Sequence, residues 1–106
     1  MAKYLFQASY TADGIRGLKK DGGTARKVAV EKLVTGLGGT LECVYFSFGG
    51  DDVLAIADLP HPENAVTASL TVGATGAVNV RTTPLLTPEQ IDAAAGKTVE
   101  YHKPGG

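Results

Sequence analysis

The fold is decided by one stretch of the sequence, Phe46-Ser47-Phe48-Gly49-Gly50-Asp51-Asp52-Val53-Leu54-Ala55-Ile56-Ala57. Its two halves are apolar and rich in strand-forming residues, and they meet across residues 49–52, which are of the types that turn a chain sharply. The stretch therefore predicts a β-hairpin at the centre of a small sheet.

The strands of this hairpin are predicted at residues 40–48 and 52–59, and each carries apolar side chains on both faces. A strand of this kind is buried on both sides. One face must meet the helices of the chain. A second copy of the chain is the most economical cover for the other face.

The segments before the hairpin predict a strand and a helix. Residues 3–10 alternate in the manner of a strand. Residues 15–20 predict a short helical turn, weakened by its glycines and broken at residues 21–23. The main amphipathic helix is predicted at residues 25–37, where apolar residues recur at helical spacing: Val30, Leu33, Val34 and Leu37.

The segments after the hairpin predict a second helix, a fourth strand and a short C-terminal helix. Residues 60–73 begin with a proline-rich helix entry and end at a glycine. Residues 77–83 are β-branched and alternating, and this strand stops near Pro84. Residues 87–95 carry a capping threonine followed by proline, and residues 98–101 predict either a short edge strand or a tail.

The resulting order, β-α-β-β-α-β, predicts an α+β protein of the ferredoxin-like class, with a four-stranded antiparallel sheet and both helices on one face. With 106 residues, the chain suits a single domain over residues 1–106. The apolar residues on the helix-free face favour two sheets packed face to face in a homodimer or a higher homo-oligomer.

Composition excludes several classes of partner and site. The net charge of -1 gives no electrostatic case for nucleic acid or an acidic membrane. The densest basic cluster, residues 16–27, is better explained as a solvated helix face than as a binding patch. The single cysteine, Cys43, allows no intramolecular disulfide and no thiolate metal cage, and its place in an apolar strand favours a structural role. We expect a cytoplasmic protein with no metal and no cofactor.

The histidine with the most interesting position is His61, which begins a helix three residues after Asp58. A histidine within reach of a carboxylate could act as a general base. The alternative is a loop residue that covers the start of the helix. His102 lies in the C-terminal segment, where we expect it to be solvated.

Two further charged residues are candidates for chemistry. Asp52 either serves the turn or faces a pocket or a neighbouring subunit. Arg81 could clamp a carboxylate or an enolate, or it could form a salt bridge between subunits, with Asp52 as a candidate partner. Both are predicted catalytic residues together with His61.

Aromatic residues at strand spacing suggest a small-molecule pocket. Tyr10, Tyr45 and Phe48 could line an apolar space with phenolic hydrogen bonds, which suits a small aromatic or carboxylate ligand. Aromatic residues in this pattern also occur as plain core.

Several segments together resemble one known family: Lys3-Tyr4-Leu5, Tyr10-Thr11, Leu37-Gly38-Gly39-Thr40-Leu41, Phe48-Gly49 with Asp52, Val80-Arg81-Thr82-Thr83-Pro84-Leu85 and Leu86-Thr87-Pro88-Glu89. They resemble the small bacterial GYD-domain proteins of the dimeric α+β barrel superfamily. In the name-giving Gly-Tyr-Asp element the tyrosine position holds Asp51, and Asp52 matches the aspartate. The resemblance implies the fold and self-association. Broader relatives include cofactor-free monooxygenases, lactone isomerases, haem-degrading enzymes and plain ligand binders.

Two functions from different classes follow. In the first, the protein binds a small molecule between sheet and helices, in a pocket lined by Tyr10, Tyr45, His61 and Arg81. Any catalysis there would be a cofactor-free oxidation or isomerisation, with His61 as base and Arg81 or a tyrosine holding an oxyanion. In the second, the protein is a non-catalytic assembly module that self-associates through its sheet.

Overall fold

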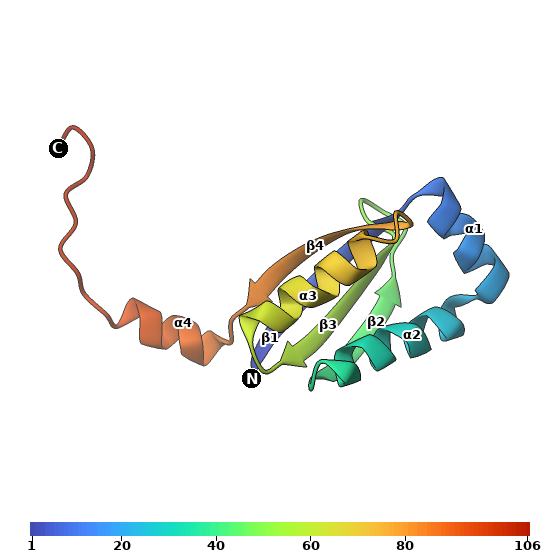
Figure 1. Ribbon diagram of the computed structural model, residues 1–106. Helices are drawn as coiled ribbons and strands as arrows, with labels where there is room; N and C mark the ends of the chain where they lie inside the picture. The colour runs from blue at the N-terminus through green and yellow to red at the C-terminus, as the bar shows by residue number, and fades with distance from the viewer.

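A computed structural model describes residues 1–106 as a four-stranded antiparallel sheet with the strand order β2-β3-β1-β4 (Figure 1). The elements in chain order are β1 (Ala2–Tyr10), α1 (Ala12–Asp21), α2 (Gly23–Gly36), β2 (Thr40–Phe46), β3 (Val53–Leu59), α3 (Pro62–Gly73), β4 (Val78–Leu85) and α4 (Pro88–Ala95). The ferredoxin-like βαββαβ prediction is confirmed, with α1 and α2 together filling the first helical connection.

The hairpin between β2 and β3 is confirmed, although β2 ends at Phe46 rather than at residue 48. The Ser47 backbone N–H donates to the carbonyl of Asp52, and the Ser47 hydroxyl donates to the carbonyl of Asp51. Phe48 has a positive φ of 49°, which a strand cannot accommodate. These contacts take the chain out of the ladder two residues earlier than the apolar pattern predicts.

The helix predicted at residues 15–20 is present but longer than the predicted short turn, because α1 is a full helix of ten residues. The hydroxyl of Thr11 accepts a hydrogen bond from the Gly14 N–H and caps the helix start. Gly14 also lies against the carbonyl of Ala77, where a Cβ would not fit. The glycine that lowers helix propensity therefore permits α1 to approach the start of β4.

The core lies between α2, α3 and the sheet. Its buried residues are Tyr4, Val34, Ala57, Leu59 and Ala65. Gly39, at the passage from α2 to β2, packs so closely on the Asp58 carbonyl that a side chain there would collide with it.

Strand β4 continues through Pro84, which pairs in register with Tyr4, although the sequence predicts a stop near this proline. Because β4 is an edge strand of the sheet, a residue without an N–H is tolerated.

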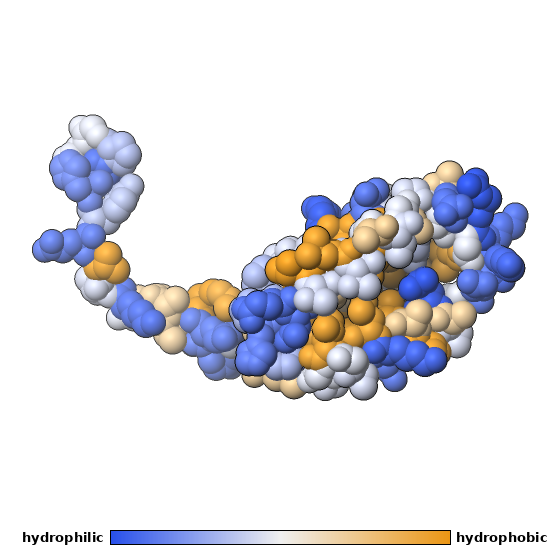
Figure 2. Space-filling model, viewed as in Figure 1, coloured by the Kyte–Doolittle hydropathy of each residue, from blue (hydrophilic) through white to orange (hydrophobic).

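The two faces of the sheet differ in cover. The covered face lies under α2 and α3, and the open face is the opposite one (Figure 1). Strand β3 alternates strictly between buried residues on the covered face and partly exposed residues on the open face. The apolar residues of the open face are Leu5, Cys43, Tyr45, Leu54, Ile56 and Leu85. Figure 2 shows that α3 also carries apolar side chains on its outer surface, where Val66 and Leu70 are exposed.

Helix α4 and residues 96–106 form a C-terminal arm that projects away from the sheet (Figure 1). Residues 98–101 form no strand, so the tail alternative holds. The Cα radius of gyration is 17.0 Å, whereas a compact chain of this length has one of about 13 Å.

No helix of the chain is both long enough and apolar enough to cross a membrane.

Candidate functional site

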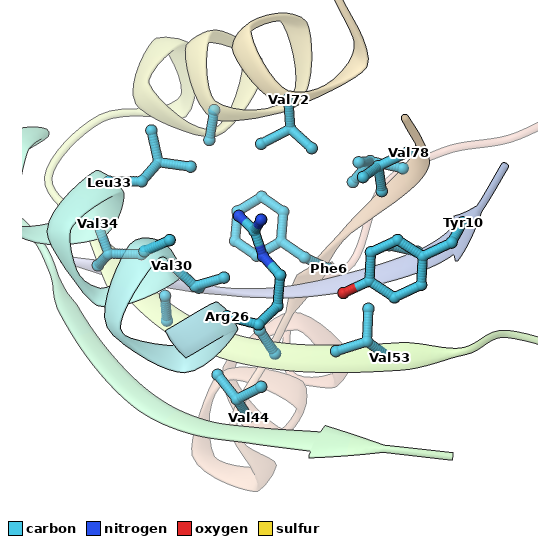
Figure 3. Close-up of a pocket in the computed structure, with 16 residues that line it drawn as sticks. Phe6, Tyr10, Arg26, Val30, Leu33, Val34, Val44, Val53, Val72 and Val78 are labelled. Carbon is cyan, nitrogen blue, oxygen red and sulfur yellow. The ribbon is translucent and has the colours of Figure 1, made fainter. Parts of the chain in front are cut away.

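A cavity of about 100 Å³ lies between α2, α3 and the covered face of the sheet (Figure 3). Of its 16 lining residues, 15 are hydrophobic. The sheet contributes short side chains at its centre, Ala8, Val53 and Ala55, which leave space that longer side chains would fill. Apolar cavities of about 150 Å³ admit molecules the size of benzene, so this somewhat smaller cavity suits an apolar group of about that size or less.

Only two side chains with polar groups line the cavity, and they come from different elements. Tyr10 is the last residue of β1, and Arg26 lies in the first turn of α2. Figure 3 shows the Arg26 side chain extending into the space in front of Phe6, with the Tyr10 hydroxyl directed toward the same space. Burial raises the pKa of the Tyr10 phenol, the positive charge of Arg26 opposes that rise, and the negative charge of Asp52 adds to it.

The guanidinium of Arg26 forms no ion pair and no hydrogen bond within the chain, although the residue is partly buried. Sequence reasoning missed this residue, because it assigned residues 16–27 to a solvated face. A signal was present: Arg26, Val30 and Leu33 lie at i, i+4 and i+7, so they share one face of α2. That face is the one turned toward the sheet.

The comparison with protein-family models matches residues 4–95 to the GYD domain. The chain belongs to the GYD-domain family. The matched range contains the whole sheet from Tyr4 onward, every residue that lines the cavity, and α4. Comparisons with curated proteins and with solved structures give no match.

Asp52 has a backbone role in this GYD domain. One carboxylate oxygen of Asp52 accepts a hydrogen bond of 2.8 Å from the Tyr10 N–H, and the Asp52 N–H donates to the carbonyl of Ala8. These bonds tie the end of β1 to the hairpin. Asp52 therefore fixes the backbone from which the Tyr10 side chain enters the cavity.

Asp51 holds a polar cluster on the open face of the sheet. Its carboxylate accepts hydrogen bonds from Gln7, Ser9 and Arg81, and the Asp51 side chain is only 17% exposed. Arg81 is thus paired within its own chain. Arg81 lies on the same face of the sheet as Asp51, its partner within the chain. The predicted pairing of Arg81 with Asp52 across a subunit boundary stays a prediction.

The other predicted site residues lie apart from one another in the GYD domain. Tyr45 is 66% exposed on the open face, and Phe48 is 59% exposed in the hairpin turn. His61 is the N-cap residue of α3, where its backbone N–H donates to Asn64. Asp58 accepts a hydrogen bond from Lys3 instead of from His61.

The predicted pocket is therefore only partly reproduced. Of Tyr10, Tyr45, His61 and Arg81, only Tyr10 lines the cavity. No group of three or more His, Cys, Asp or Glu side chains is arranged to hold a metal ion. The arrangement that the GYD domain does present is an apolar cavity with one phenol and one guanidinium at its polar end.

Proposed function

We propose that this GYD-domain protein binds a small molecule with an apolar body in the cavity between its sheet and its helices, in the cytoplasm. The observation that carries the proposal is the hydrophobic character of 15 of the 16 lining residues around unfilled space. Unfilled apolar space costs stability, because its lining lacks contacts, and a ligand would restore them. The unpaired Cys43 supports a reducing compartment.

Thermal-shift and ligand-observed NMR measurements with a panel of small aromatic compounds, quinones and phenols would test this proposal. We expect stabilisation of the wild type by at least one compound. Ala68→Leu should abolish the effect, because Ala68 is buried on the cavity side of α3. Val66→Leu is the matched control, since Val66 lies on the outer surface of the same helix. A panel without any binding to the wild type would overturn the proposal.

A catalytic form of this proposal is a cofactor-free oxidation or isomerisation. In the cavity the polar groups available to such a reaction are the Tyr10 phenol and the Arg26 guanidinium. A guanidinium is suited to hold an oxyanion. His61 and Arg81 would have to act outside this cavity, so the geometry supports binding more directly than their predicted catalytic roles.

Self-association through the open face is a second candidate function, favoured by a separate observation. Leu54 and Ile56 are only partly covered on the open face, and the C-terminal arm exposes further apolar residues. The exposed apolar residues of the arm and of its connection to β4 are Leu86, Ile91, Val99 and Tyr101. We propose that a second copy of the chain covers these surfaces in a homodimer. Sedimentation velocity over a range of concentrations tests it, and a chain that remains monomeric throughout would overturn it.

A further inference from the structure

We infer that the ligand of the cavity is a singly charged organic anion, an apolar body carrying a carboxylate, and that Arg26 recognises its charge. This inference rests on the proposed function and adds the chemical class of the ligand. It assigns the recognition of the ligand's negative charge to Arg26 of α2, which is not among the site residues predicted from the sequence.

The first argument is the missing counter-charge of Arg26. Each guanidinium or ammonium group that the sheet carries is paired: Lys3 with Glu42 and Asp58, and Arg81 with Asp51. Arg26 extends among Phe6, Val30 and other apolar side chains with no acceptor (Figure 3). A partly desolvated charge is costly unless it is paired. A bound carboxylate would supply the two oxygens that match the planar guanidinium.

The second argument is the position of Arg26 at a junction. A groove of about 320 Å³ lies between α1, α2 and the start of β4, next to the cavity. Tyr10, Arg26, Ala29 and Val78 line both spaces. A ligand could therefore place its apolar body in the cavity and its charged end at the junction. There the Tyr10 hydroxyl can donate a second hydrogen bond to the carboxylate.

The third argument limits the charge of the ligand. Asp13 and Asp21 line the groove beyond the junction, and neither forms an ion pair with Arg26. Their negative charges repel a dianion that would extend into the groove. A single carboxylate, held at Arg26 and pointing its body away from these aspartates, fits this distribution of charge.

The alternative is that the Arg26 stem merely covers apolar surface while its head group stays in water. Matched ligands separate the two. We would titrate the full chain with benzoate and with benzyl alcohol, and with hexanoate and hexanol, following the amide resonances of residues around the cavity. We expect each carboxylate to bind at least tenfold more tightly than its alcohol.

Variants of α2 complete the experiment. Arg26→Gln should weaken carboxylate binding at least tenfold and leave alcohol binding unchanged, whereas Arg26→Lys should give an intermediate loss. Lys27→Gln, the neighbouring exposed position, is the control and should change neither. Equal affinities for acid and alcohol in the wild type would overturn the inference while leaving the proposed function in place. Absence of binding by all four compounds would overturn both. The wild-type comparison needs no substitution, so it decides the inference even if Arg26→Gln fails to fold.

Discussion

The two faces of the sheet differ in whether the charged side chains beside them are paired. On the open face, the Nζ atom of Lys3 lies 3.2 Å from Oε1 of Glu42 and 3.1 Å from Oδ2 of Asp58. Arg81 pairs with Asp51 on the same face. In the cavity under the covered face, where water is scarcer, the one charged side chain is that of Arg26 from α2, and it has no partner. The open face, which is closer to solvent, has paired charges. The guanidinium of Arg26 at the covered face has no partner, although less water is there to solvate it.

This difference separates two roles of polar groups. Charges that are paired within the chain make the open face less costly to cover with another apolar surface than unpaired charges would, because a buried charge without a partner costs more than a buried pair. An unsatisfied guanidinium in an apolar cavity is suited to a ligand that brings its own negative charge. The comparison thus supports the proposed assembly through the open face and the proposed recognition of a ligand at the covered face.

The largest effect on stability should come from a substitution in the core beneath the covered face. Leu59 is fully buried in the core, at 0% exposure. Leu59→Ala should lower the free energy of unfolding by about 2–5 kcal/mol, because it removes buried methyl groups and leaves a cavity. Urea denaturation measures this loss. Leu70→Ala, on the exposed surface of α3, is the same substitution and should cost less than about 0.5 kcal/mol. Equal costs would place Leu59 outside the core.

A charge placed on the open face should come next in effect. Ile56→Glu would put an unpaired carboxylate in the proposed contact between copies. We expect the dissociation constant of the dimer to rise at least tenfold, about 1.4 kcal/mol or more. Analytical ultracentrifugation measures the change. Val28→Glu, on an exposed position of α2, should leave association unaffected. A dimer that tolerates Ile56→Glu would move the contact away from the open face.

A smaller effect is expected from the polar cluster of the open face. Asp51→Asn removes the charge that pairs with Arg81 but keeps an oxygen for Gln7 or Ser9. Because Arg81 is 67% exposed, we expect a loss of about 1 kcal/mol, less than a fully buried pair would cost. Asp92→Asn on α4 is the exposed control. A loss of several kcal/mol for Asp51→Asn would mean that the cluster is buried in the assembled protein.

The sequence predicts the sheet well, because each strand carries a local signal. Strand β1 alternates over most of its length, β2 and β3 are apolar runs, and the hairpin between them is marked by its turn residues. Helix α1 was underpredicted because its stability comes from tertiary contact. Gly14, which weakens an isolated helix, is what lets α1 reach Ala77.

The site was harder to predict than the fold, since side chains from distant segments converge there. The sequence predicts Tyr10 as a pocket residue because aromatic residues recur at strand spacing. Arg26 was missed because the local density of lysine and arginine suggests solvation, and only its helical phase with Val30 and Leu33 turns it inward. Arg81 was selected because it lies among short polar groups, yet those groups and Asp51 are what satisfy it. Chemical type alone could not distinguish a paired from an unpaired guanidinium.

The smallest predicted effect is a shift in the pKa of Tyr10, and it tests whether Arg26 and Tyr10 are neighbours in solution. Burial raises the pKa of the Tyr10 phenol above its ordinary value of about 10, and Arg26 opposes the rise. Arg26→Gln should therefore raise the pKa of Tyr10 further. Phenolate absorbance, read as the difference between each protein and its Tyr10→Phe counterpart, isolates this residue from the other tyrosines. An unchanged pKa would separate the two side chains.

The same titration has a consequence for stability with a definite sign. Above pH 10 the unfolded chain releases the Tyr10 proton while the folded chain retains it, so the folded state binds more protons. Stability should fall as pH rises from the unfolded pKa through the folded one, and fall less steeply in Tyr10→Phe. Lys3, whose pKa is raised by its hydrogen bonds to Asp58 and Glu42, loses its contribution in the same range in both proteins, so it cancels in the comparison. Since Arg26→Gln raises the folded pKa, it should steepen the decline, whereas Lys27→Gln should not. A steeper decline confined to Arg26→Gln would locate the unpaired charge of the covered face beside the phenol, where a carboxylate ligand would have to lie.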